Sequence, residues 1–126
     1  MTALSAEHEI VVSDAVIAGV AARAAAAVPG VVRLEPGLRG MVAGWARSGK
    51  QLLRGQESLA GDGVRVEKTT DGGRAIRVDV SLGGDGRAAE VGAAIQRAVT
   101  GAVLEHTGVR IEQVSVVIID IEPGGV

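Results

Sequence analysis

The chain has 126 residues, 15 acidic and 13 basic side chains and a formal net charge of −2, a size typical of one domain with one core. It lacks Cys, Phe and Tyr, which excludes disulfides and thiolate chemistry and leaves Val, Ile, Leu and Ala to form the core. No apolar run approaches the roughly 20 residues that span a bilayer, and the first residues do not resemble a signal peptide. We therefore expect a single cytoplasmic domain covering residues 1–126.

The N-terminal region is predicted to form a strand, a helix and a second strand. Residues 7–14 (EHEIVVSD) contain three consecutive β-branched residues, followed by Ser13 as a candidate helix cap. Residues 14–28 carry apolar side chains at helical spacing, and Pro29-Gly30 is expected to end this helix. Residues 31–35 (VVRLE) then read as a short strand.

A β-hairpin is predicted after residue 63. Residues 64–68 and 74–82 are two strand-like segments that flank the turn-rich loop TTDGG. The second segment alternates apolar and polar residues, which predicts one dry and one wet face.

The C-terminal region is predicted to form a second helix and a long strand. After GGDG (83–86), residues 87–107 carry an apolar stripe at helical spacing, with Asp85 expected to cap the start of the helix and Gly108 its end. Residues 109–121 form the long strand, and residues 122–126 a flexible tail.

These elements predict a mixed α/β (α+β) fold. Because the hairpin has only one apolar face, we expect two helices packed on one face of a mixed, largely antiparallel sheet of four to five strands. Each half runs strand, helix, glycine cap and strand, which predicts two similar strand–helix–strand-like halves. The order of the strands does not follow from the sequence.

No catalytic or metal-binding pattern is present in the sequence. The two histidines, His8 and His106, are far apart in the chain, no serine lies in a G-x-S-x-G motif, and two histidines without cysteine do not make a zinc site. The closely spaced acids are typical of solvated strand ends rather than of acid–base catalysis. We therefore expect a protein that is not an enzyme and that uses no cofactor or metal.

The GGDG motif leaves one alternative open, a small RNA-binding module with a KH-like order of strands and helices. In KH domains a Gly-x-x-Gly loop clamps the nucleic-acid backbone, but that loop joins two helices, whereas here the motif joins a strand to a helix and carries Asp85. The chain also lacks aromatic stacking platforms. Nucleic acid is the less favoured partner, and salt-sensitive RNA binding through Arg87 or Arg97 would be its signature.

The last strand predicts a surface for self-association. Residues 116–119 are consecutive β-branched residues, so both faces of the strand are apolar there. If both helices cover one face, a second copy of the protein is expected to cover the other, with Val117 and Ile119 as contact residues. The sequence thus predicts a homo-oligomer.

Residues 36–63 form a basic, glycine-rich connection. Within it, residues 38–55 carry four basic side chains and no acid, beside the only aromatic residue of the chain. As a helix this segment would suit a membrane interface or a protein groove, but Gly40, Gly44 and Gly49 in its interior disfavour a helix. A loop with a locally packed Trp is the alternative. The candidate contact residues are Arg39, Met41, Trp45, Arg47, Lys50, Leu52, Leu53 and Arg54.

Three segments together resemble the alkaline-shock, Gls-type family of bacterial envelope stress response proteins. They are the opening strand–helix–VPGV unit, the hairpin VRVEKTTDGGRAIRVDVSL and the closing TGVRIEQVSVVIIDI. The resemblance implies a small α/β domain without known enzymatic activity, which self-associates and acts at the cytoplasmic side of the membrane. It also implies a possible anchor, because in the best-known case a separate small membrane protein supplies one.

The resemblance covers residues 9–35 and 64–121 and transfers no functional residues. Residues 36–63 are longer and more basic than the usual connection of this family. For that segment we expect contact with anionic lipid or with an acidic partner.

Overall fold

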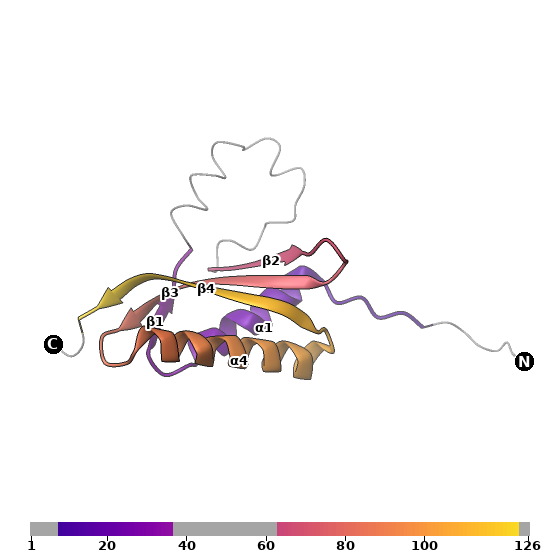
Figure 1. Ribbon diagram of the computed structural model, residues 1–126. Helices are drawn as coiled ribbons and strands as arrows, with labels where there is room; N and C mark the ends of the chain where they lie inside the picture. Colours follow the sequence, from indigo (N-terminus) through magenta and orange to yellow (C-terminus); the bar gives the residue numbers. More distant parts are fainter. Residues whose placement is uncertain (1–7, 37–62, 124–126) are drawn as a thin grey trace, which may run out of the picture.

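The computed structural model describes residues 8–36 and 63–123, which form two helices and a four-stranded sheet (Figure 1). Both helices lie on one face of the sheet, and among the described residues no helix lies on the other (Figure 1). The predicted mixed α/β class is confirmed. The elements are α1 (Asp14–Ala26), β1 (Val31–Leu34), β2 (Val64–Lys68), β3 (Arg74–Gly83), α4 (Ala88–Thr107) and β4 (Ile111–Glu122).

The central strand of the sheet is β3, which pairs with each of the other three strands. β4 runs parallel along one edge of β3, as expected for strands joined by a helical crossover. β2 and β1 run antiparallel along the other edge, opposite residues 74–78 and 80–82 of β3 respectively. The sheet is therefore mixed and largely antiparallel, as predicted, but only three strands wide.

The hydrophobic core lies between β3 and the two helices. Alternate residues of β3 are buried, and they face a buried stripe of α4 and the small side chains of α1. Alanines bring the helices close to each other and to the sheet, which offsets the lack of large aromatic side chains. The predicted apolar stripes are confirmed at Ile17, Val20, Val28, Ile76, Val78, Val80, Leu82, Val91, Ile95, Val99 and Val103. Val16, also predicted for the stripe of α1, is 51% exposed, and Ala21 and Ala25 are buried in addition.

The helix ends agree in part with the prediction. The Ser13 side chain accepts a hydrogen bond from the Val16 N–H at 3.3 Å, and Gly108 ends α4 with a φ of 77°, which only glycine adopts readily. The prediction for Asp85 was wrong, because Arg87 occupies the N-cap position of α4 and makes no side-chain capping bond. α1 ends at Ala26, one turn before the Pro29-Gly30 pair.

The strand predicted at residues 7–14 is not formed by its described part. Residues 8–13 have no strand pairing, and Ile10 and Val11 are 89% and 76% exposed. Their β-branched side chains favour extended backbone, but both edges of β3 are already occupied. The second half, β3–α4–β4, forms a complete strand–helix–strand unit, whereas the described first half consists of α1 and β1. At the other end, Glu122 belongs to β4 rather than to the predicted tail.

Candidate functional site

The face of the sheet opposite the helices, termed the outer face, is largely polar. Along β3 the residues that alternate with the core point to this face, and the strand register aligns them in rows with their neighbours. Arg65, Arg77 and Ser115 form one row across β2, β3 and β4. The polar residues of β3 on this face are less exposed to solvent than predicted, because Asp79 is 9% exposed and Ser81 is fully buried. Both polar groups have hydrogen-bond partners, which permits their burial.

An ion cluster on the outer face connects β1 to β4 across β3. The Arg33 guanidinium lies 2.8 Å from the carboxylate of Glu35 and 2.6 Å from that of Glu122. The buried Ser81 hydroxyl donates to Glu35 at 2.6 Å. The hydrogen bond and charge of Glu122, together with the charge of Glu35, raise the pKa of Arg33 above its ordinary value. The cluster is a structural clasp, because its only cation is fully engaged by two acids.

Replacing Arg33 by Gln is expected to lower the melting temperature, since Glu35 and Glu122 then lose their shared cation. The decrease should be larger at low salt than at high salt, because the side chain of Arg33 is half exposed and its ion pairs are screened. Thermal unfolding at two ionic strengths measures this effect. The double variant R33Q/E122Q should recover part of the loss, and a double variant no more stable than R33Q would contradict the clasp.

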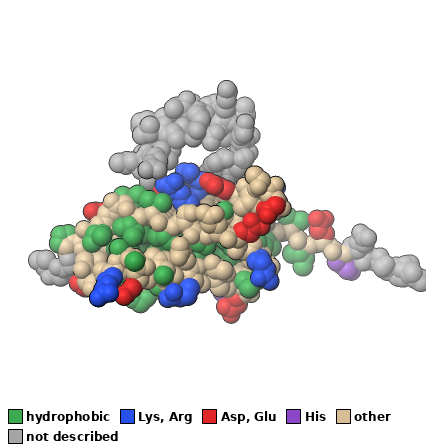
Figure 2. Space-filling view, viewed as in Figure 1, with side chains coloured by type: hydrophobic (Ala, Val, Ile, Leu, Met, Phe, Trp, Pro, Cys, Tyr) green, Lys and Arg blue, Asp and Glu red, His purple; other side chains and the backbone are tan. Residues whose placement is uncertain are grey.

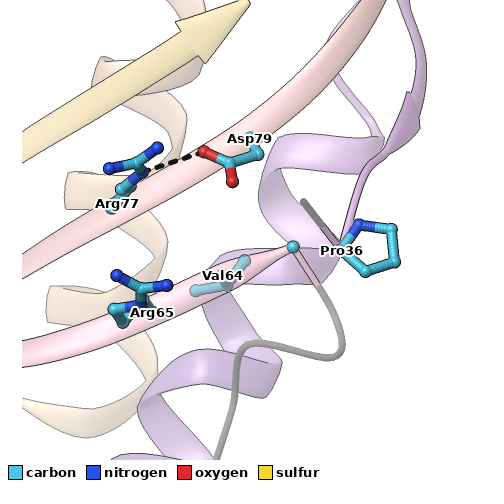
Figure 3. Close-up of a pocket in the computed structure, with 6 residues that line it drawn as sticks. Pro36, Val64, Arg65, Arg77 and Asp79 are labelled. Carbon is cyan, nitrogen blue, oxygen red and sulfur yellow. Dashed lines mark hydrogen bonds and ion pairs between the residues drawn. The ribbon is translucent and has the colours of Figure 1, made fainter. Parts of the chain in front are cut away.

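A shallow hollow opens on the outer face where β1 ends and β2 begins (Figure 3). Here the backbone of Asp79 joins the two strands, accepting from the Glu35 N–H at 2.8 Å and donating to the Gly63 carbonyl at 2.9 Å. The hollow has a volume of about 10 Å³, room for about one water molecule. This is too small for a substrate or an enclosed cofactor. It is lined by Pro36, Gly63, Val64, Arg65, Arg77 and Asp79.

A larger open groove of about 590 Å³ lies at the opposite end of β3, beside residues 10–12. Its walls also come from the hairpin turn and from the connection between α4 and β4. Arg74, which lines it, is paired with Asp14 at 3.1 Å. Within residues 8–36 and 63–123, no group of three or more His, Asp or Glu side chains is placed to hold a metal ion. The groove is lined both by apolar side chains of residues 10–12 and by the polar side chains of Arg74, Thr107 and Arg110.

Besides the outer face, the edge of β4 that faces away from β3 is a candidate interaction surface. Among the described strands, β4 pairs only with β3, so its other edge has no partner strand. The Val114 carbonyl of β4 accepts a hydrogen bond from the Gln96 amide of α4 at 3.1 Å. Residues 113–119, termed the β4 edge, carry no charge, whereas β2 carries Arg65, Glu67 and Lys68. Charged residues protect an exposed edge against pairing with another chain, and this stretch lacks that protection.

The two residues predicted for self-association both lie on β4. Val117 is opposite Asp79 and half-buried on the outer face. Ile119 is 50% exposed and lies at a register irregularity, so the two side chains do not continue one regular row. Their place on an available edge could not be predicted from the sequence.

The predicted lipid or partner contacts, Arg39 to Arg54, lie outside the described residues. The residues that bracket this connection, Pro36 and Gly63, both line the hollow on the outer face (Figure 3). The connection therefore leaves and re-enters the domain at one place. In the described part of the chain, no helix is both long and apolar enough to cross a membrane.

Sequence reasoning missed the polar groups on the outer face. The pairing of Arg65 with Arg77 could have been inferred from the sequence. A five-residue hairpin loop that brings Lys68 opposite Arg74 also brings these two arginines together. The Arg33 clasp had no such signal, because it depends on the order of strands.

Comparison with known proteins connects this arrangement to one family. The model of the alkaline shock protein 23 family, described as having a cell envelope-related function, matches residues 3–123. No curated protein and no solved structure matches the chain. The family match extends over both helices, all four strands and the basic connection. The chain therefore belongs to the alkaline shock protein 23 family.

Proposed function

We propose that this protein is a non-enzymatic, self-associating scaffold of the envelope stress response, acting at the cytoplasmic face of the cell membrane. The family supplies the coarse function, which is related to the cell envelope. The observation that carries the scaffold is the uncharged β4 edge, whose backbone donors and acceptors have no partner strand among the described residues. A second copy of the same edge supplies matching donors and acceptors.

The charges around β4 favour an antiparallel arrangement of two copies. Arg110 and Glu112 lie at the start of the strand and balance each other. Asp120 and Glu122 lie at its end, where Glu122 is paired with Arg33. Parallel pairing would place the Asp120 carboxylates of the two copies beside each other, and antiparallel pairing separates them. Opposite charges across strands stabilise the pair, whereas like charges destabilise it. Two β4 edges are therefore complementary in their backbone groups, and their charges favour the antiparallel arrangement.

Membrane contact is assigned to residues 38–55, with Arg39, Arg47, Lys50 and Arg54 facing an anionic leaflet or the acidic surface of a small membrane-anchored partner. Each cation near an anionic leaflet contributes about 1 kcal/mol. Four such groups hold one copy weakly, and an assembly of copies adds avidity. Self-association and weak lipid contact thus support each other in a scaffold.

Sedimentation velocity of the wild-type protein over a wide range of concentrations tests the proposal. We expect the weight-average mass to rise from that of a monomer to that of a dimer or larger assembly. The same samples, centrifuged with vesicles of phosphatidylglycerol, should bind more strongly where the assembly forms. A protein that stays monomeric throughout would rule out the scaffold, whatever its affinity for lipid.

A further inference from the structure

Two arginines face each other on the outer face without an acid between them. Arg65 and Arg77 are direct cross-strand partners in the antiparallel β2–β3 pair, and both line the hollow (Figure 3). Like charges directly opposite each other destabilise a sheet. Such a pair is favourable when an anion completes it.

The charges of these two arginines are only partly balanced. The Arg77 Nε donates to the Asp79 carboxylate at 3.0 Å, and this pair is largely buried. Arg65 makes no ion pair with any described acid, and its Nε is the one buried side-chain nitrogen or oxygen without a hydrogen-bond partner in the described part of the chain. The three side chains therefore carry one surplus positive charge, located on Arg65, and the exposed Glu67 lies on the same face in the next row, opposite Ala75.

The neighbouring side chains add hydrogen-bond donors. Ser115 is the register partner of Arg77 on β4, and the Gln113 amide donates to its hydroxyl at 3.1 Å, which leaves the Ser115 proton free to donate elsewhere. Ala75, the register partner of Gln113 on β3, has a small side chain. The surface beside the row of Arg65, Arg77 and Ser115 is therefore open. Donors from three adjacent strands thus point to the same side of the sheet.

We propose that Arg65, Arg77 and Ser115 bind a phosphate-class oxyanion on the outer face. A guanidinium binds phosphate through several N–H donors, and the tetrahedral oxygens of phosphate accept from donors on three strands, whereas a carboxylate offers two oxygens in one plane. The hollow beside the arginines is too small to enclose a ligand, so the anion lies on the surface.

The phosphate has two possible sources, the headgroup of an anionic phospholipid or a free phosphate. The lipid source rests on the proposed membrane function, because Pro36 and Gly63 place the ends of the basic connection at the same hollow. A headgroup site here would turn the outer face toward the bilayer. A free-phosphate site would stand without any membrane contact.

Side-chain NMR of the ¹⁵N-labelled wild-type protein is the first arm of the test. Titration with inorganic phosphate should shift the Nε–H signals of Arg65 and Arg77 saturably, while acetate at equal ionic strength should leave them nearly unchanged. Equal shifts with acetate, or no shift with either anion, would overturn the site. This arm uses no variant, so it does not depend on whether a substitution folds.

Vesicle co-sedimentation of R65Q is the second arm, with R97Q as the matched control, because Arg97 is an exposed arginine on α4, away from the outer face. A headgroup site predicts about tenfold weaker binding of R65Q to phosphatidylglycerol vesicles, little change for R97Q, and partial recovery with R65K. If phosphate shifts the arginine signals but R65Q binds vesicles as well as R97Q does, the site is assigned to free phosphate. If the wild-type protein does not bind vesicles but phosphate still shifts the NMR signal of Arg65, the proposed membrane contact is wrong and the phosphate site is retained.

Discussion

Replacing Val117 and Ile119 together by lysine is expected to raise the dissociation constant of the assembly on the order of 100-fold, or about 2.7 kcal/mol. Antiparallel pairing of two β4 edges brings four new cations into one interface, where like charges and Lys side chains oppose strand addition. The fold should tolerate the change, because Ile119 is 50% exposed and Val117 lies opposite the Asp79 carboxylate. Sedimentation equilibrium gives the two dissociation constants.

The matched control for this variant is Leu104→Lys. Leu104 is 42% exposed on α4, so this change also exchanges a partly exposed apolar side chain for a cation, but away from β4. It should leave the dissociation constant nearly unchanged. Equal weakening by both variants would indicate a general charge effect and would contradict an interface at the β4 edge.

Replacing Arg39, Arg47, Lys50 and Arg54 by Gln is expected to abolish most binding to anionic vesicles. At about 1 kcal/mol per cation near an anionic leaflet, the loss is on the order of 100-fold to 1,000-fold. Trp45 is the only Trp of the chain, so its fluorescence reports on this segment without background. In the wild type we expect a blue shift with anionic vesicles that high salt reverses, and in the variant no shift.

Four exposed basic residues of the folded domain provide a control with the same change in charge. Gln at Arg23, Lys68, Arg87 and Arg97 removes four positive charges from exposed positions outside the connection and away from β4. This control should retain most of its vesicle binding, because its charges are spread over the domain rather than gathered in one segment. A loss as large as that of the connection variant would mean that net charge, and not residues 38–55, determines lipid contact.

Local patterns were sufficient to predict most of the fold. The alternation along β3, the helical spacing in α1 and α4, and the caps at Ser13 and Gly108 each depend on nearby residues. The predicted two-helix layer on a mixed sheet followed from these patterns together. Where a local pattern failed, as at residues 8–13, the β-branched residues pair with no strand of the described sheet.

The candidate surfaces depend on strand order, which local patterns do not encode. That β3 is central, and that β1 and β2 share one of its edges, follows from long-range pairing. This order brings Arg33 near Glu122 and leaves the other edge of β4 available. The burial of Asp79 and Ser81 on the predicted wet face has the same origin, since their partners Arg77 and Glu35 are positioned by the sheet.

Hydrogen exchange of the β4 amides at low and high protein concentration tests the central claim most directly. Pairing of two copies through the β4 edge predicts that amides within residues 113–119 whose N–H groups point away from β3 exchange about tenfold or more slowly in the assembly. Amides of β2 should exchange at the same rate at both concentrations. If β4 exchange is unchanged where sedimentation shows an assembly, the copies associate through another surface and the account is wrong.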